Sequence, residues 1–186
     1  IGDILTARIG RTLWDLHKNN APMLEKNIVY QNYAGKKFKP RNDWGLDLLG
    51  MSYSAAMGDL DNDGDADILA VGGQARLFRN EGDGTFVEIT EAAGVAIDAN
   101  SQGVAFLDFD RDGFLDFYAA SYGTLADSEI ATRDYLFRNR GDGTFEDVTE
   151  AMGVPVSDDA DHGRGVCVAD YDEDGWPDIY VGNYRL

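Results

Sequence analysis

The feature that most constrains the fold of this chain is a nine-residue pattern that occurs three times in the same register. Each copy has Asp at positions 1, 3, 5 and 9 and Gly at position 6. The copies begin at Asp59, Asp108 and Asp170, so that successive copies start 49 and 62 residues apart. Repeats of about 40 to 50 residues are typical of a four-stranded propeller blade, and we interpret the spacing in this way rather than as a helical hairpin repeat.

A second element alternates with these Asp loops. Residues 77–86 read LFRNEGDGTF, and residues 136–145 read LFRNRGDGTF. A degenerate copy lies upstream, where residues 29–32 (VYQN) are followed by Gly35 and, at matching spacing, by Phe38. The repeat therefore occurs at least three times in part.

The segments between these motifs have the character of β-strands. Short apolar runs such as residues 104–107 and 117–120 flank the Asp loops and are bounded by Gly and Asp, which favours strands over helices. The Gly-Asp-Gly-Thr segments are typical of hairpin turns. We therefore predict an all-β fold over residues 27–186, with β-propeller-type blades of four antiparallel strands and about three blades. In residues 1–26, apolar residues recur at helical spacing and predict a short N-terminal helix.

The Asp loops carry the chemistry of a calcium site. Ca²⁺ takes six to eight oxygen ligands in tolerant geometry, and alternate carboxylates in a tight loop converge on one centre. Without an ion, four carboxylates in one loop repel one another. We predict three calcium sites, formed by the side chains of Asp59, Asp61, Asp63, Asp67, Asp108, Asp110, Asp112, Asp116, Asp170, Asp172, Asp174 and Asp178, and by the backbone carbonyls of Asp65, Phe114 and Trp176.

An EF-hand loop begins with the same spacing but needs a bidentate Glu at position 12 and flanking helices. Position 12 is Ala70, Ala119 and Val181 in the three copies. The pattern therefore excludes an EF-hand, the similar dockerin loop and a calcium-sensor switch.

Composition limits the possible partners. Acidic residues outnumber basic ones by 34 to 16, which gives a formal charge of -18. This charge argues against nucleic acid and anionic membrane surfaces as ligands. The 44% of apolar residues indicates a folded domain, and no apolar stretch approaches the ~18 residues of a membrane span.

Other reactive residues point to no catalytic site. Cys167 lies in an apolar run and is expected to be a small buried hydrophobic residue. His17 and His162 are too far apart for a zinc or catalytic constellation. Residues 140–142 spell Arg-Gly-Asp, but this tripeptide lies in the repeat's own hairpin turn, which favours a structural role. We expect no enzymatic activity.

The alternation of D-x-D-x-D-G-x-x-D loops with L-F-R-N-x-G-D-G-T-F and T-E-x-x-G-V resembles the FG-GAP/VCBS repeat family over about residues 27–186. This resemblance implies an integrin-alpha-like β-propeller with calcium in the loop between the first two strands of a blade. It also implies a secreted, periplasmic or cell-surface location and binding to proteins or glycans.

The resulting expectation is a calcium-binding, non-catalytic extracellular module for protein or glycan binding or assembly. The alternatives are a structural subunit of a larger extracellular complex and an accessory propeller of a secreted carbohydrate-active enzyme. Residues 121–133 and 155–164 contain the insertions that make the second repeat longer, and these segments are the candidate recognition surface. The chain opens at Ile1 without Met and stops at Leu186, where the next L-F-R-N element is due. We therefore expect a processed N-terminus and a propeller completed by further blades or another subunit.

Overall fold

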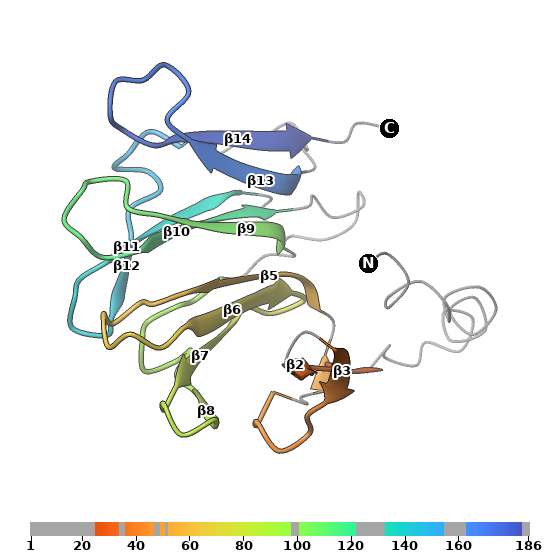
Figure 1. Ribbon diagram of the computed structural model, residues 1–186. Helices are drawn as coiled ribbons and strands as arrows, with labels where there is room; N and C mark the ends of the chain where they lie inside the picture. Colours follow the sequence, from red (N-terminus) through yellow and green to blue (C-terminus); the bar gives the residue numbers. More distant parts are fainter. Residues whose placement is uncertain are drawn as a thin grey trace.

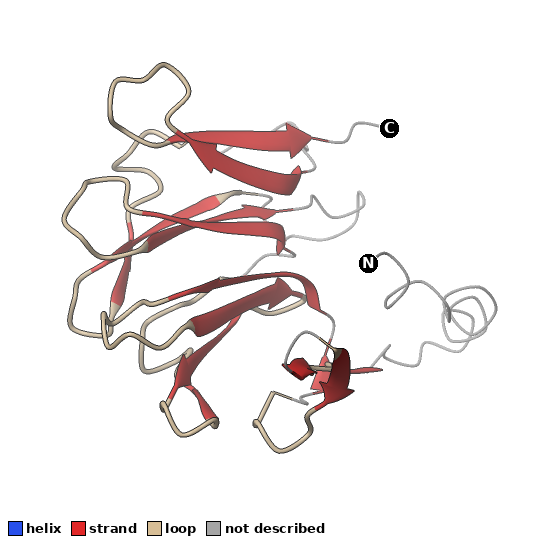
Figure 2. Ribbon diagram, in the orientation of Figure 1, coloured by secondary structure: helices blue, strands red, loops and turns tan. Residues whose placement is uncertain are grey.

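The computed structural model describes residues 25–33, 36–46, 49–50, 52–97, 101–121, 133–154 and 163–183. Every regular element in these ranges is a β-strand (Figure 2). The N-terminal helix predicted within residues 1–26 lies outside the described residues except at its end. There, Glu25–Lys26 form strand β1, so the prediction is wrong for those two residues. Among the described residues, no helix could serve as a membrane span.

Two complete four-stranded antiparallel sheets confirm the predicted blade. Blade 1 has the order β5 (Ser52–Gly58), β6 (Asp67–Gly72), β7 (Arg76–Asn80) and β8 (Phe86–Glu88). Blade 2 has the order β9 (Ser101–Leu107), β10 (Asp116–Ser121), β11 (Tyr135–Asn139) and β12 (Phe145–Asp147). Each Asp loop joins the first two strands of its blade.

Partial repeats lie on both sides of these blades (Figure 1). Strands β13 (Gly163–Ala169) and β14 (Asp178–Asn183) pair around the third Asp loop and correspond to the first two strands of a blade. Strands β2 (Tyr30–Tyr33) and β3 (Lys37–Pro40) form the hairpin of the degenerate upstream copy. Strand β1 pairs with β4 (Leu49–Gly50).

Strand alternation builds the hydrophobic core between successive sheets. Side chains of one strand point alternately to its two faces, so each central strand contributes to two interfaces. Leu69 of β6 and Phe117 of β10 belong to the cluster between blades 1 and 2. Tyr118 of β10 and Val181 of β14 belong to the next cluster. The ring of Phe117 stacks on that of Phe137, with centroids 4.8 Å apart.

The same alternation corrects the prediction for Cys167. This residue is exposed, whereas its neighbours Val166 and Val168 pack against the cluster shared with blade 2. Cys167 pairs with Tyr180 of β14, which is 72% exposed. An apolar run in a strand is buried on both faces only where other elements cover both faces. Within the described residues, only the face of β13 and β14 toward blade 2 is covered.

The T-E-x-x-G-V element at residues 90–95 and its degenerate counterpart at residues 41–46 (RNDWGL) each join one repeat to the next. The backbone N–H of Phe145 in β12 donates to the carbonyl of Ala93 at 2.8 Å, and the backbone N–H of Phe86 in β8 donates to the carbonyl of Trp44 at 3.1 Å. The residue after each accepting carbonyl is a glycine with positive φ, +72° at Gly94 and +77° at Gly45. A Cβ at Gly45 would lie 3.0 Å from the carbonyl oxygen of Phe86, so glycine allows this close approach.

All three Asp loops lie at the same end of the sheets (Figure 1). Segment 121–133 begins and ends at the opposite end, because Ser121 pairs with Ser101 at the start of β9 and Tyr135, at the start of β11, pairs with Ala119. Segment 155–164 ends there, since Gly163 starts β13. Residues 122–132 and 155–162 lie outside the described residues.

Candidate metal centres

Each Asp loop is closed by the carboxylate at its first position. Asp59 accepts hydrogen bonds from the N–H groups of Asp63 and Gly64 at 3.1 and 3.0 Å. In the second loop, Asp108 accepts from Asp112 and Gly113 at 3.0 and 3.1 Å, and in the third, Asp170 accepts from Gly175 at 2.9 Å. The sequence pattern therefore corresponds to one loop geometry repeated three times.

The fourth position of each loop has a left-handed backbone conformation. The residues there are Asn62, Arg111 and Glu173, with φ of 60°, 58° and 63°. They are the only non-glycine residues with positive φ in the part of the chain that the structure describes. Such a conformation is unfavourable for residues with a Cβ, and the Asp pattern gave no indication of it.

The carboxylate at position 9 ties the loop to the sheet. Oδ2 of Asp67, Asp116 and Asp178 accepts the N–H of the second loop residue at 3.0, 3.0 and 2.9 Å. In the two complete blades, Oδ1 of the same carboxylate accepts the backbone N–H of the asparagine in L-F-R-N. Asn80 donates to Asp67 and Asn139 donates to Asp116, both at 2.8 Å. This Asp therefore has a structural role besides the ligand role predicted for it.

Three carboxylates converge in every loop. In each group of three, one carboxylate oxygen of every residue lies within 4.8 Å of one carboxylate oxygen of the other two. The groups are Asp59, Asp61 and Asp63 in the first loop, Asp108, Asp110 and Asp116 in the second, and Asp170, Asp172 and Asp178 in the third. These nine residues all belong to the twelve predicted side-chain ligands. By the same distance criterion, Asp67, Asp112 and Asp174 are not part of the groups. The ligand roles of these three side chains and of the carbonyls of Asp65, Phe114 and Trp176 stay predictions.

Burial makes the charge in these loops costly. Burial raises the pKa of Asp116 to about 6, despite hydrogen bonds from the N–H groups of Asn139 and Phe109. Burial is also the largest cause of the raised pKa of Asp67. The pKa of Asp61 is raised first by burial and then by the charge of Asp63. A bound cation would stabilise these carboxylates in their ionised form.

The asparagine of L-F-R-N connects the loop, the hairpin turn and, in blade 2, the neighbouring blade. Asn139 is 1% exposed, and its Nδ2 donates to the carbonyls of Leu60 at 2.7 Å and Leu115 at 3.1 Å. Its Oδ1 accepts the N–H of Gly141 at 2.9 Å. Leu60 is the second residue of the first Asp loop, so that loop is held by a side chain from blade 2.

The Arg-Gly-Asp tripeptide of residues 140–142 forms the turn between β11 and β12. The Arg140 guanidinium lies 3.1 Å from Glu146. Oδ1 of Asp142 accepts hydrogen bonds from the N–H and the hydroxyl of Thr144 at 3.0 and 2.6 Å. Both charged side chains therefore stabilise the hairpin, in agreement with a structural role.

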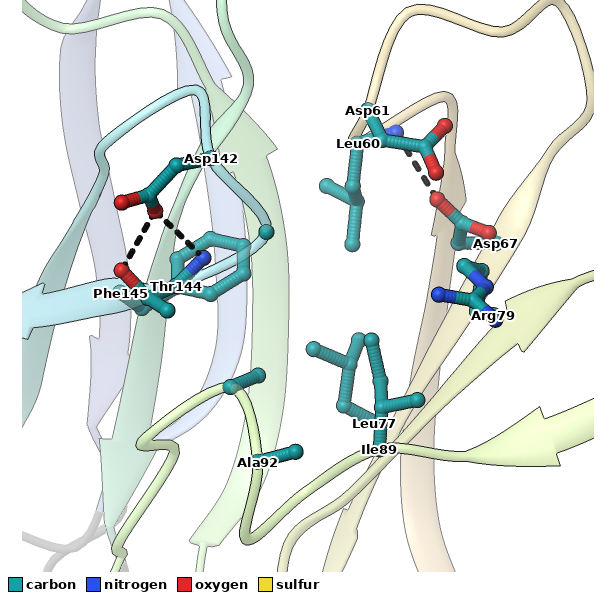
Figure 3. Close-up of a pocket in the computed structure, with 12 residues that line it drawn as sticks. Leu60, Asp61, Asp67, Leu77, Arg79, Ile89, Ala92, Asp142, Thr144 and Phe145 are labelled. Carbon is teal, nitrogen blue, oxygen red and sulfur yellow. Dashed lines mark hydrogen bonds between the residues drawn. The ribbon is translucent and has the colours of Figure 1, made fainter.

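A pocket of about 250 Å³ lies between the first Asp loop and the hairpin turn of blade 2 (Figure 3). Asp61, Asp67 and Arg79 line one side, and Asp142 and Phe145 line the other. One side of the first candidate centre therefore borders this gap between blades. His17 and His162 lie outside the described residues.

Comparison with known proteins shows which repeat this chain contains. The pattern of the FG-GAP-like repeat matches residues 20–70, 69–119 and 122–181. A stretch of 52 residues, 28% of this chain, is 51% identical to cartilage acidic protein 1 of Homo sapiens and 49% identical to that of Xenopus tropicalis. The mouse protein is 47% identical over the same length. The matched stretch spans 8% of the length of these relatives. Because the repeat pattern matches most of the sequence, the chain belongs to the FG-GAP-like repeat family.

Proposed function

We propose that each of the three Asp loops binds one calcium ion and that these ions stabilise the blades of an extracellular binding module. The observation that carries the calcium proposal is the convergence of three carboxylates within 4.8 Å in every loop. Two carboxylates about 4 Å apart repel by roughly 4 kcal/mol at an effective dielectric near 20. A divalent cation converts this repulsion into attraction and closes the loop.

The ligand set favours calcium over other cations. All the grouped side chains are carboxylates, and none is His or Cys, which disfavours zinc and copper. Mg²⁺ demands near-octahedral geometry and keeps several waters, whereas Ca²⁺ accepts six to eight oxygens in flexible geometry. A loop with four Asp side chains and backbone carbonyls, together with water, can supply that number.

Replacing Asp110 with Ala tests the sites one at a time. The side chain of Asp110 is part of the second group and is distant in sequence from the other two loops. We expect Asp110→Ala to reduce the calcium stoichiometry from three to two per chain, as measured by isothermal titration calorimetry and native mass spectrometry.

Asp142→Ala is the matched control, because Asp142 lies in the hairpin turn and binds Thr144. It removes the same charge and should keep three ions. Equal stoichiometry in both variants, or no binding by the unmodified protein, would contradict the assignment of the second loop.

The wider role that we propose is non-catalytic binding of protein or glycan partners outside the cell. FG-GAP-like repeats and the similarity to cartilage acidic protein 1 support an extracellular location and a binding function. The alternative roles are a structural subunit of an extracellular complex and the accessory propeller of a secreted enzyme. The candidate partner surface is at the end of the sheets opposite the calcium loops.

The ends of the candidate recognition segment 121–133 are part of the blade. The Ser121 N–H donates to Asp134 Oδ1 at 2.7 Å. Arg133 packs over the ring of Tyr135 at 4.5 Å and forms an ion pair with Asp147. Arg133, the last residue of this segment, thus stabilises blade 2. This part of the candidate surface is therefore reduced to residues 122–132, and the segment 155–164 stays part of the candidate surface.

Replacing residues 122–132 with one glycine restores the three-residue connection that links β6 and β7 in blade 1. Because surface insertions contribute little to stability, we expect the melting temperature and calcium stoichiometry to change little. Partner association should fall, which can be measured by comparing proteins captured by the two forms from extracellular fluid. Loss of folding would place the segment in the core, and unchanged capture would place the partner surface elsewhere.

A further inference from the structure

Two arginines at the same position of the repeat have different partners. Arg138, in the L-F-R-N element of blade 2, reaches into the second Asp loop. Its Nη2 lies 2.6 Å from Asp110 Oδ2 and 3.2 Å from Asp112 Oδ2. The equivalent Arg79 of blade 1 instead donates from Nε and Nη2 to Glu81 at 2.9 and 2.7 Å. The guanidinium therefore pairs with the loop carboxylates in blade 2 and with the hairpin in blade 1.

Sequence differences in the hairpin explain the two arrangements. The position of Glu81 in blade 1 is occupied by Arg140 in blade 2. Arg140 pairs with Glu146, whose position in blade 1 is occupied by Val87. Glu146 lies opposite Arg138 in the pairing of β11 with β12, but it forms its ion pair with Arg140, and Arg138 instead contacts the Asp loop. In blade 1, Glu81 holds Arg79, although Arg79 borders the same pocket as Asp61 and Asp67 (Figure 3).

A guanidinium bound to these carboxylates opposes a divalent cation in two ways. It occupies Oδ2 of Asp110 and Asp112, which are both predicted ligands. Its positive charge also lies within a few ångströms of the ion's position, where the partly buried carboxylates are only partly screened by water. Calcium must therefore displace Arg138 or bind beside it. In both cases the affinity of the second loop for calcium is lower.

We propose that Arg138 is an internal counter-ion that weakens calcium binding in the second loop, and that Glu81 protects the first loop from the same effect. Arg138 and Glu81 thus determine the relative affinities of two otherwise equivalent sites. The inference depends on the proposed calcium binding. It predicts that the first loop fills at lower calcium concentration than the second, by about fivefold, the upper end of what an exposed ion pair contributes.

The two loops can be titrated separately by NMR. The amides of Gly64 and Gly113 each donate to the first carboxylate of their own loop, so their ¹H–¹⁵N signals report loops 1 and 2 individually. In Arg138→Gln, calcium should bind loop 2 about fivefold more tightly while loop 1 changes little. Arg138→Met, which keeps the apolar stem of the side chain, should give the same result.

Arg133→Gln is the matched control, because it removes the same charge from a blade 2 side chain that pairs with Asp147 and Glu150 and with no loop carboxylate. It should leave the affinity of loop 2 nearly unchanged. The reciprocal variant Glu81→Gln releases Arg79 and should weaken loop 1 severalfold. Its control is Glu88→Gln, which removes the same charge from a carboxylate that lies 3.7 Å from Arg76.

The outcomes separate this inference from the calcium proposal. If no glycine amide of the unmodified protein responds to calcium, the proposed function itself is wrong. If both loops bind and Arg138→Gln leaves loop 2 unchanged, calcium binding stands and the counter-ion role is overturned. Weaker binding in Arg138→Gln would also overturn it, since Arg138 would then orient the carboxylates for the ion.

Discussion

Exhaustive removal of calcium is expected to lower the melting temperature of this protein by roughly 20 °C. A ligand that binds only the folded state adds about 2.7 kcal/mol at a hundredfold excess over its dissociation constant, and there are three proposed sites. For a chain of this size, 1 kcal/mol corresponds to about 2 to 4 °C. Differential scanning calorimetry in calcium and in excess EGTA measures the shift.

This loss of stability should extend beyond the loops themselves. Position 9 of each loop is the first residue of the second blade strand, and burial already raises the pKa of Asp67 and Asp116. Without the ion, the repulsion among the loop carboxylates acts directly on β6 and β10, the strands that supply Leu69 and Phe117 to the core.

Calcium-saturated EGTA at the same concentration is the control for the chelator itself. Re-addition of calcium should restore the original melting temperature. An unchanged melt after exhaustive chelation would show that the loops are solvated acidic turns whose hydrogen bonds suffice for closure.

The sequence predicted the repeated parts of the fold because periodic residues have the same role in each copy. The D-x-D-x-D-G-x-x-D and L-F-R-N patterns located the blades, and both complete sheets have the predicted four strands. Nine of the predicted carboxylates form the three groups. The error at Cys167 arose because an apolar run does not reveal which face of a strand a neighbour covers.

Contacts between elements that are far apart in sequence were not predictable. Asn80 and Asn139 were recognised as repeated residues, but their bonds to position 9 of the Asp loops depend on the pairing of the strands. The different partners of Arg79 and Arg138 depend on single substitutions in the hairpin. The positive φ at Asn62 had no sequence signal beyond the preference of Asn for that conformation.

The connection between the blades depends strongly on Asn139. Its amide satisfies the carbonyls of Leu60 and Leu115 in a buried environment, and it accepts the N–H of Gly141. Asn80 occupies the same position in blade 1. Its Nδ2 donates to Ala66, the counterpart of Leu115, and its Oδ1 accepts from Gly82. Asn80 is only half-buried, and its bonds lie at the exposed surface, so the two asparagines differ in burial and in the bond to Leu60.

Asn139→Ala should therefore lower the free energy of unfolding by about 3 kcal/mol, because each buried polar group left without a partner costs about 1 to 3 kcal/mol. Asn80→Ala, the matched control, should cost about 1 kcal/mol, since water can replace its exposed bonds. Urea unfolding of both variants in saturating calcium measures the difference. The bond to Leu60 also holds the second residue of loop 1, whose N–H closes that loop on Asp67. Asn139→Ala should therefore also weaken calcium binding in loop 1, which belongs to the other blade. If both variants lowered the free energy of unfolding equally, the interface between the blades would not depend on the side chain of Asn139.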